Sequence, residues 1–384
     1  MQVVAVIFRA IFRFFTEADI VLFLISIAST IYGLILISSV TGNVGNEVSV
    51  QIGAFVIGIV LFILFSYVDI DIIADKSKLL FLFSMLLLFT LFLWGEGIGE
   101  GRGSWLRFGV IGIQPAEIVK VPFIIIIARI IVNFKERRTF NSFFSIIQIA
   151  AVFAIFIATI LVVAQDLGTS VVYFGILAVM LFAGGMKLRW FLLAFAALVA
   201  VIPFIWENDI IFSEFQRNRI LAPFMPDEID PTRMGVLWQS DLSVQAIATG
   251  GLRGQGLGNG RLTQTANAIP AHHTDFIFSV AGEELGFIGC MVIIALLVAV
   301  IIRCVYVGIK SNNSLGMLVC MGIAALTFVH MFMNIGMALG IMPTIGVPLP
   351  FFSYGGSSIV TFFAAMGIVS GIKMRPKPAR FRNL

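Results

Sequence analysis

Asp275 has the most reactive setting in the sequence, because its carboxylate stands directly before a long apolar segment that begins at Phe276. Polar His273 and Thr274 precede it, and Glu283 follows about two helical turns later. An ionisable side chain near the end of a membrane-spanning segment is costly and usually functional. A positioned carboxylate can take the proton of a hydroxyl nucleophile. In the alternative interpretation, Thr274 or Asp275 only caps the helix that follows.

Further ionisable residues lie within or between other apolar segments. Glu117 and Lys120 have i,i+3 spacing and therefore share one helix face, and Asp166 lies between two apolar segments. These three residues are predicted to form a paired network that lines a water-filled cavity, or a salt bridge that holds helices together; the two roles can coexist. His330 and Asn334 lie one turn apart and favour a hydrogen bond between helices over a metal site.

The composition indicates that membrane-spanning helices must position these residues. With 59% hydrophobic and 12% charged residues, the chain cannot fold as a soluble domain with a polar surface. We predict an all-α polytopic membrane protein with ten transmembrane helices. The predicted helices are approximately Ile20–Ser38, Val50–Val68, Leu79–Trp94, Pro115–Asn133, Phe143–Val163, Ser170–Gly185, Trp190–Trp206, Phe276–Val305, Leu315–Gly340 and Phe352–Lys373.

The short loops predict the orientation. Loops on one side carry the lysines and many arginines, namely Arg9, Arg13, Lys76, Lys78, Lys135, Arg137, Arg138, Lys187, Arg189, Arg303, Lys310 and the tail from Lys373 to Arg382. The positive-inside rule makes this side, and both termini, cytoplasmic. The opposite loops contain arginine and no lysine, at Arg102, Arg107, Arg217, Arg219, Arg233, Arg253 and Arg261. Loops with arginine but no lysine indicate that guanidinium groups bind phosphate or carboxylate in a bidentate way. The alternative is that this composition arose by chance. A net charge of +4 on the cytoplasmic side reports topology, not nucleic-acid binding.

The sequence predicts one membrane domain, residues 1–384, with three appended parts. These are an interfacial N-terminal helix (1–19), a large extracytoplasmic loop between helices 7 and 8 (207–275) and a basic cytoplasmic tail (374–384). The loop contains the glycine-rich run from Gly250 to Arg261, which either places backbone N–H groups against a ligand or forms a flexible turn. The cysteines have neither disulfide nor metal spacing.

Several motifs, in this order and spacing, resemble the SEDS family of bacterial cell-wall polymerases, whose members are RodA, FtsW and SpoVE. They cover essentially the whole chain: WLRFGVIGIQPAEIVK, QDLGTS, FQRNRI, GGLRGQGLGNG, HTDFIFSVAGEELGF and PLPFFSYGGSS. The resemblance implies a ten-helix fold in the bacterial cytoplasmic membrane. It also implies polymerisation of lipid II, an undecaprenyl-diphosphate disaccharide-pentapeptide, at the outer face. The implied partners are a class B penicillin-binding protein that cross-links the product and other elongation-complex membrane proteins.

The resemblance also implies residue roles. Asp275 matches the essential acid of the family and is predicted to be the general base. The residues predicted to bind substrate are Trp105, Arg107, Glu117, Lys120, Asp166, Arg219, His273, Thr274, Glu283 and Ser353. No protein metal site or certain cofactor is predicted, although a divalent cation, Mg²⁺ or Mn²⁺, could lie against the diphosphate. The sequence departs from the family pattern at AQDLGT and at IPAHHTD, and neither departure changes Asp275.

Three alternatives to an elongation polymerase stay open at this point. The final motif, from Leu339 to Ser358, looks closer to RodA than to the division paralogue, which favours elongation over division or sporulation. A lipid II flippase would also use a cavity with buried charges, but it needs ionisable groups accessible from both sides. Here we expect every buried carboxylate to lie on the outer half. A non-catalytic scaffold would leave Glu117, Lys120 and Asp166 unexplained.

Overall fold

The computed structural model describes residues 14–41, 46–95, 103–109, 111–206, 214–265 and 271–375. Residues 1–13 of the predicted interfacial helix, 376–384 of the basic tail, and 207–213 and 266–270 of the outer loop lie outside these ranges. Of the predicted interfacial helix, residues 14–17 are helical. The Phe14 side chain is buried. The centre of its ring lies 5.6 Å from that of Phe23 and 6.3 Å from that of Phe62. This short stretch therefore packs against the helix bundle.

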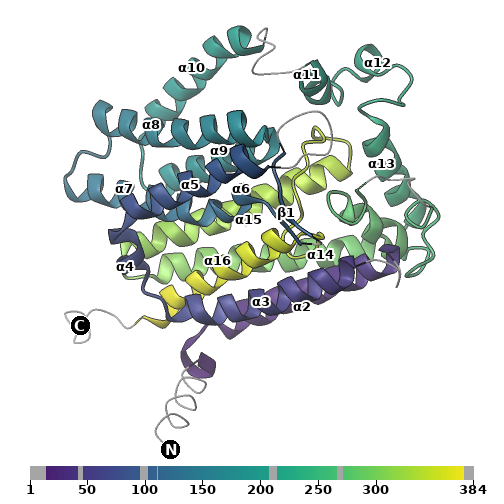
Figure 1. Ribbon diagram of the computed structural model, residues 1–384, viewed down its shortest axis with the longest axis horizontal. Helices are drawn as coiled ribbons and strands as arrows, with labels where there is room; N and C mark the ends of the chain where they lie inside the picture. Colours follow the sequence, from purple (N-terminus) through teal and green to yellow (C-terminus); the bar gives the residue numbers. More distant parts are fainter. Residues whose placement is uncertain are drawn as a thin grey trace, which may run out of the picture.

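Each of the predicted transmembrane segments is helical, and all of these helices except α10, which extends away from the others, lie side by side in one bundle (Figure 1). Their bounds are α2 (Ile20–Thr41), α3 (Glu47–Tyr67), α5 (Ser77–Trp94), α6 (Pro115–Ile118) followed by α7 (Lys120–Glu136), α8 (Phe143–Thr159) continuing as the π-helix η2 (Ile160–Ala164), α9 (Leu167–Ala183), α10 (Leu188–Trp206), α14 (Ile277–Lys310), α15 (Ser314–Ala338) and α16 (Gly356–Met374). The chain is therefore an all-α bundle, as the composition predicted.

Seven helices in the described part of the chain are long and apolar enough to cross a membrane: α2, α3, α5, α8 with η2, α14, α15 and α16. Helices α9 and α10 are apolar but shorter. Helix α7 is separated from α6 at Val119, which leaves it 17 residues long. Ten membrane crossings therefore stay a prediction.

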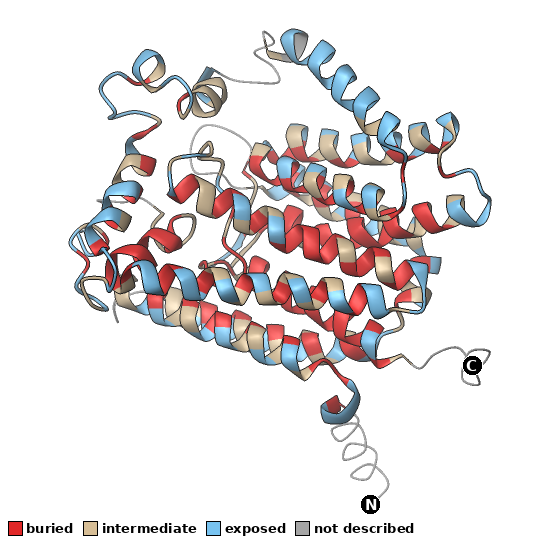
Figure 2. Cartoon of the chain, turned by 180° about the vertical axis from the view of Figure 1, so that it is seen from behind, coloured by how far each residue is buried: buried red, intermediate tan, exposed pale blue. Residues whose placement is uncertain are grey.

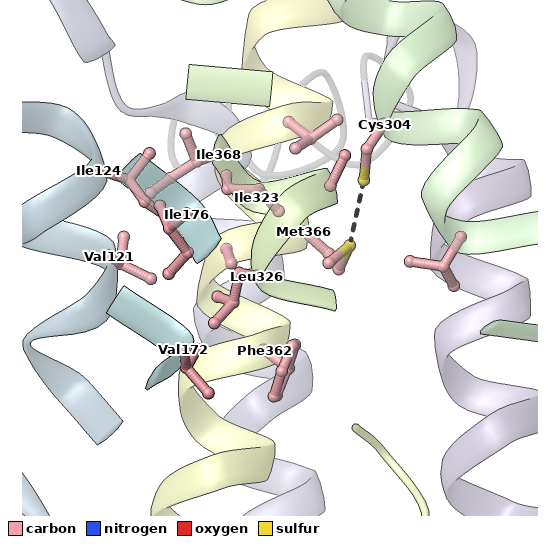
Figure 3. Close-up of a cluster of buried hydrophobic side chains, with 14 of the residues drawn as sticks. Val121, Ile124, Val172, Ile176, Cys304, Ile323, Leu326, Phe362, Met366 and Ile368 are labelled. Atoms are coloured by element: carbon pink, nitrogen blue, oxygen red, sulfur yellow. Dashed lines mark hydrogen bonds between the residues drawn. The ribbon is translucent and has the colours of Figure 1, made fainter. Parts of the chain in front are cut away.

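Helices α15 and α16 lie at the centre of the bundle, where α7, α9 and α14 surround them (Figure 1). Figure 3 shows side chains from α7, α9, α15 and α16 meeting in one apolar cluster beside Cys304, whose Sγ lies 3.8 Å from the sulfur of Met366. The three cysteines are free and buried. Close helix contacts use glycine: a methyl group added at Gly367 of α16 would lie 2.5 Å from the Phe62 carbonyl oxygen of α3.

Helix α10 differs from the rest of the bundle. It is almost entirely pale blue in Figure 2, and none of its described side chains is buried. A helix that is apolar all round and exposed on this scale suits contact with lipid on most of its surface.

Asp19 lies at the end of the bundle where α2 begins and α16 ends, and its side chain is completely buried. Arg303 of α14 donates from Nε to both carboxylate oxygens, at 3.0 and 2.8 Å. The backbone N–H of Leu22 also donates to the carboxylate, and Lys373 Nζ lies 3.7 Å from it. The expectation that every buried carboxylate lies on the outer half is therefore wrong. The sequence did not reveal this burial because it arises from contacts between helices far apart along the chain.

Short elements complete the two ends of the bundle. They are α4 (Ile70–Asp75), the antiparallel hairpin of β1 (Leu106–Phe108) and β2 (Ile111–Ile113), α11 (Glu214–Leu221), α12 (Pro226–Ile229) and α13 (Trp238–Gly250). Helix α13 belongs to the predicted loop of residues 207–275. It packs on α14 and α15, since Ser243 donates to the Ala338 carbonyl at 2.6 Å and shares a hydrogen bond with Ser279.

Candidate active site

The turn that carries Asp275 is fixed by its backbone. Residues 271–276 form this turn directly before α14. Three consecutive carbonyl groups in it accept hydrogen bonds from distant segments: that of His273 from the N–H of Tyr354 (2.8 Å), that of Thr274 from the hydroxyl of Ser353, and that of Asp275 from the side-chain amide of Asn334 (2.8 Å). Helix α15 and the loop before α16 therefore aim the Asp275 side chain. A carboxylate held in this way loses little freedom when a ligand binds.

A cavity of about 940 Å³ opens at this end of the bundle, and Asp275 forms part of its wall. The β1–β2 hairpin, the first turns of α6 and α9, helix α11, the Asp275 turn and the loop before α16 contribute the other walls. Eight of the eleven predicted site residues line it: Trp105, Arg107, Glu117, Asp166, Arg219, His273, Thr274 and Asp275. Its volume lies in the upper part of the range for cavities that bind organic ligands.

The surroundings of Asp275 make its carboxylate an unusually strong base. Desolvation by burial raises the pKa of Asp275 to about 6, the charge of Asp166 acts in the same direction, and the Arg219 guanidinium opposes both. Among the described residues, no hydrogen-bond donor contacts the Asp275 carboxylate. Its oxygens are therefore left to the cavity. A group with a pKa near the working pH combines a large ionised fraction with a high proton affinity, which is the best compromise for a general base.

Asp166 is the second carboxylate of the cavity, and it has a different setting. Its Oδ1 accepts from the Thr169 N–H at 2.8 Å, so it caps the N-terminus of α9. Its Oδ2 accepts from the Thr169 hydroxyl (2.8 Å) and from Gln114 Nε2 (2.9 Å). Burial raises the pKa of Asp166, and the two hydrogen bonds from Thr169 lower it in part. Asp166 therefore serves the structure of α9 while its charge reaches Asp275.

Glu117, Lys120 and His330 form a buried chain beneath the cavity. Lys120 donates to Glu117 Oε1, and its Nζ lies 2.9 Å from His330 Nε2. His330 Nδ1 lies 2.9 Å from the Pro348 carbonyl oxygen, which can only accept, so Nδ1 carries the hydrogen and Nε2 accepts from Lys120. Glu117 Oε2 is buried without a hydrogen-bond partner in the described part of the chain. These contacts link α6 and α7 to α15 and to the loop before α16.

Two arginines and one tryptophan enclose the cavity from outside the bundle. Burial lowers the pKa of Arg219, and the charge of Asp275 offsets part of this shift. The Arg219 guanidinium carbon lies 4.5 Å from the centre of the Phe215 ring. Arg107 and Trp105 belong to the β1–β2 hairpin region, and Arg107 is exposed. Both arginines therefore line the cavity, where a guanidinium can contact an anionic ligand.

A metal ion in this cavity would need a bound ligand to supply part of its coordination. The described residues contain no group of three or more His, Cys, Asp or Glu side chains placed to hold one. In sites that handle phosphates, Mg²⁺ is commonly held by one or two carboxylates together with phosphate oxygens. Asp166 and Asp275, which interact electrostatically, are the pair in the cavity that could supply the carboxylates.

Comparison with known proteins identifies the family. Residues 19–377 match the family model described as "Cell cycle protein", which covers FtsW, RodA and SpoVE. The chain belongs to this family. The resemblance to SEDS proteins predicted from the sequence motifs is therefore confirmed.

Relatives of this SEDS protein include named enzymes. It is 33% identical over 360 residues to the peptidoglycan glycosyltransferase MrdB of Escherichia coli K12, and 94% of each chain is covered. It is 32% identical over 370 residues to a probable peptidoglycan glycosyltransferase FtsW of Geobacter metallireducens, with 94% of this chain and 95% of the relative covered.

Solved structures share the fold. A chain from a structure described as "Structural coordination of polymerization and crosslinking by a peptidoglycan synthase complex" matches with a TM-score of 0.79 and 25% identity, covering 93% of this chain and 98% of that one. The rod shape determining protein RodA of Thermus thermophilus matches with a TM-score of 0.68 and 23% identity, covering 93% and 97%. The helical bundle described above is therefore the SEDS fold.

Glu283 does not face the cavity of this SEDS protein. It is completely buried, and its carboxylate accepts from the N–H groups of Leu262 and Thr263, each at 2.8 Å. It is also not among the charges that shift the pKa of Asp275. The prediction that Glu283 binds substrate gains no support from this position. Its carboxylate instead anchors the end of the glycine-rich segment to α14.

The glycine-rich segment is also occupied by contacts within the protein. Helix α14 is broken at Gly286, whose φ is 69°, so the carbonyls of Glu283 and Glu284 lose their helical partners. The N–H groups of Gln255 and Gly256 donate to these carbonyls, both at 2.9 Å. This part of the segment therefore repairs the hydrogen bonding of a kinked helix.

Lys120 and Ser353 lie behind the residues that line the cavity. Lys120 contacts Glu117 and His330, and Ser353 contacts the Thr274 carbonyl and accepts from the Leu349 N–H at 2.8 Å. Both were predicted to bind substrate, and neither lines the cavity. Their position makes each of them a support for a residue that does.

Sequence reasoning missed the importance of Asn334 for the site. Its Nδ2 donates to the carbonyls of Asp275 and Val347, both at 2.8 Å, while its Oδ1 is buried without a partner in the described chain. The signal available was a polar residue in an apolar helix, which correctly indicated a hydrogen bond to another segment. Glu47 and Tyr354, which line the cavity, carried no signal of this kind.

Proposed function

We propose that this protein is a glycosyltransferase that polymerises lipid II into glycan strands, with Asp275 as the general base. The observation that carries the proposal is the Asp275 carboxylate, held by its backbone on the wall of a large cavity, with its pKa raised to about 6 and its oxygens open to a ligand. Both relatives named above are peptidoglycan glycosyltransferases, the FtsW of Geobacter metallireducens a probable one.

The proposed reaction joins two lipid-linked sugars. Asp275 removes the proton from the 4-hydroxyl of the acceptor sugar, and the oxygen attacks the anomeric carbon of the donor. The bond from that carbon to the diphosphate breaks, the configuration inverts, and undecaprenyl diphosphate leaves with the bonding electrons. Arg219 and Arg107 line the cavity and are proposed to hold the diphosphate, because a guanidinium can bind phosphate oxygens in a bidentate way.

The proposed orientation places this reaction at the outer face of the bacterial cytoplasmic membrane. The basic loops gather at the end of the bundle opposite to Asp275, which the positive-inside rule makes cytoplasmic. We propose ten crossings with both termini in the cytoplasm. The acceptor sugar could then reach Asp275 from water while its polyprenyl chain stays in the bilayer.

A transpeptidase partner is part of the proposal. The fold matches a chain from a structure described as coordinating polymerisation and crosslinking in a peptidoglycan synthase complex, which supports a class B penicillin-binding protein as partner. The motif from Leu339 to Ser358, closer to RodA, supports a role in elongation together with other membrane proteins of that complex. Rescue of rod shape in cells depleted of their elongation polymerase, but not of septation in cells depleted of FtsW, would test this role.

The direct test uses purified full-length protein with and without a class B partner, supplied with lipid II. Wild type should form glycan polymer, whereas Asp275→Asn should fold, bind the partner and lose about 10²- to 10⁴-fold in rate. An active Asn variant refutes the base assignment. Rescue of an inactive Asn variant by Mg²⁺ or Mn²⁺ would shift the role of Asp275 to cation binding. Transfer of lipid II across vesicle membranes without polymer would favour a flippase.

A further inference from the structure

A second cavity, of about 230 Å³, lies at the end of the bundle opposite to Asp275. The 34 residues of α14 separate the two sites. The end of α14, the start of α15, the end of α16 and the residue Asp71 of α4 form the walls of this cavity. The side chains that matter for the argument are those of Asp71, Tyr306, Lys310, Ile372, Lys373 and Arg375. Nothing in the proposed glycosyl transfer uses them.

The cavity carries excess positive charge. Its acid, Asp71, is already bonded: Oδ2 accepts from Arg375 Nη1 at 2.9 Å and Oδ1 accepts from Asn313 Nδ2 at 2.8 Å. Arg375 also pairs with Asp69, at 2.9 Å. Arg375 is therefore fully neutralised by two acids, Asp69 and Asp71, so the positive charge of the cavity comes from its two lysines, Lys310 and Lys373.

The two lysines of the cavity differ in how far their charge is already shared. Lys310 Nζ lies 5.9 Å from the centre of the Tyr306 ring and makes no ion pair with a described carboxylate. Lys373 Nζ lies 3.7 Å from the Asp19 carboxylate, which it shares with Arg303, and donates to the Ala18 carbonyl at 3.3 Å, so only part of its charge is left for a ligand. Two ammonium groups at one cavity attract an anion.

The apolar surroundings identify the kind of anion. Val307 and Ile372 line the cavity itself. Outside it, Ile302, Tyr306 and Ile309 are exposed by 62%, 48% and 68% and follow i, i+4, i+7 spacing on one face of α14. In a membrane, such a stripe contacts acyl chains. A free phosphate would use only the charges, whereas a phospholipid would use the charges and the stripe together.

We propose that this cavity binds the phosphate of an anionic phospholipid in the cytoplasmic leaflet. Lys310 and Lys373 contact the phosphate, and the acyl chains lie along the Ile302, Tyr306 and Ile309 face of α14. Because α2, α14 and α16 meet at Asp19 beside this site, the lipid would stabilise the cytoplasmic end of the bundle. The proposal does not depend on the glycosyltransferase reaction, since its test measures lipid binding.

The test compares Lys310→Gln and Lys310→Gln/Lys373→Gln with wild type, using full-length protein in neutral detergent at low salt. Short-chain phosphatidylglycerol is titrated while the thermal midpoint is recorded, with phosphatidylcholine and sodium phosphate as separate probes. Lys78→Gln is the matched control, because Lys78 is exposed on the basic side and outside the cavity. The Lys310→Gln variant keeps the Lys373 contacts, so it guards against a folding defect.

Wild type should show saturable stabilisation by phosphatidylglycerol and little by the other probes. Each lost lysine should weaken binding about fivefold, and both together about 30-fold, while Lys78→Gln should bind like wild type. Equal weakening in Lys78→Gln, unchanged affinity in the double variant, or equal stabilisation by phosphatidylcholine would overturn the proposal. Equal stabilisation by sodium phosphate would overturn the lipid as the source of the anion.

Discussion

The two ends of the helix bundle each hold a carboxylate that burial desolvates, but they treat it in opposite ways. At the basic end, Asp19 receives two bonds from Arg303, one from the Leu22 N–H and the field of Lys373. At the cavity end, Asp275 has its backbone fixed by neighbours but receives no hydrogen bond on its carboxylate from the described residues. Its pKa is consequently raised to about 6.

This difference separates a carboxylate that stabilises the fold from one that is held ready for a substrate. Ion pairs and hydrogen bonds stabilise the ionised form of a carboxylate and make it a weaker base. An open one is costly to the folded state and useful to a reaction, as strained or unsatisfied groups in active sites commonly are. The Glu117–Lys120 pair lies between these cases, because it is paired on one oxygen and unsatisfied on the other.

The largest effects on stability are expected at the Glu117–Lys120 pair. Both side chains are almost completely buried, so Glu117→Gln or Lys120→Met leaves an uncompensated charge and should lower the free energy of unfolding by about 3 to 5 kcal/mol. The double variant should lose less than the sum of the single losses. Thermal unfolding of the four proteins in detergent measures this, and additive losses would show that the pair does not act as a unit.

Neutralising the two compared carboxylates should give opposite changes in stability at about pH 7.5. Asp19→Asn removes the partner of Arg303 and should cost about 3 kcal/mol. Asp275 has a folded pKa above its ordinary value, so its contribution is lost as pH rises from about 4 through 6, and the ionised form destabilises the fold above that. Asp275→Asn should therefore leave the unfolding midpoint unchanged or raise it. A fall as large as that of Asp19→Asn would contradict the distinction between the two ends.

Replacing Arg219 by lysine tests whether the open end recognises a diphosphate. Lysine keeps the charge but loses the bidentate fork, so use of lipid II should weaken by roughly tenfold at limiting substrate, with the unfolding midpoint unchanged. The matched control is Arg233→Lys, an exposed arginine that bonds to Asp241 outside the cavity. Normal polymerisation by Arg219→Lys at limiting lipid II would remove Arg219 from the binding site.

The smallest expected effects are opposite shifts of the pH midpoint for activity. Arg219 lowers the pKa of Asp275 and Asp166 raises it. Arg219→Gln should therefore move the midpoint upward and Asp166→Asn should move it downward, each by about 0.5 to 1 pH unit. Rates normalised to the plateau of each variant separate this shift from any loss of binding. Shifts in the same direction would show that these residues do not act through the charge on Asp275.

The sequence predicted the parts of this account that depend on local pattern. Hydropathy located the helices, and the HTDF motif placed Asp275 directly before α14. It could not predict contacts between segments far apart in the chain. The Asn334 bond to the Asp275 carbonyl joins residues 59 positions apart, and Arg303 reaches Asp19 across 284 positions. The contacts of Glu283 were also out of reach of the sequence, because the N–H groups of Leu262 and Thr263 that donate to its carboxylate lie 21 and 20 positions away.

The measurement that tests the central claim most directly is the initial rate of glycan formation by the wild-type protein as a function of pH, at limiting lipid II. With Asp275 as the base, the rate should rise about tenfold per pH unit below a midpoint near 6 and level off above it. A rate that stays constant from about pH 5 to 7.5 would contradict the assignment of Asp275 as the general base.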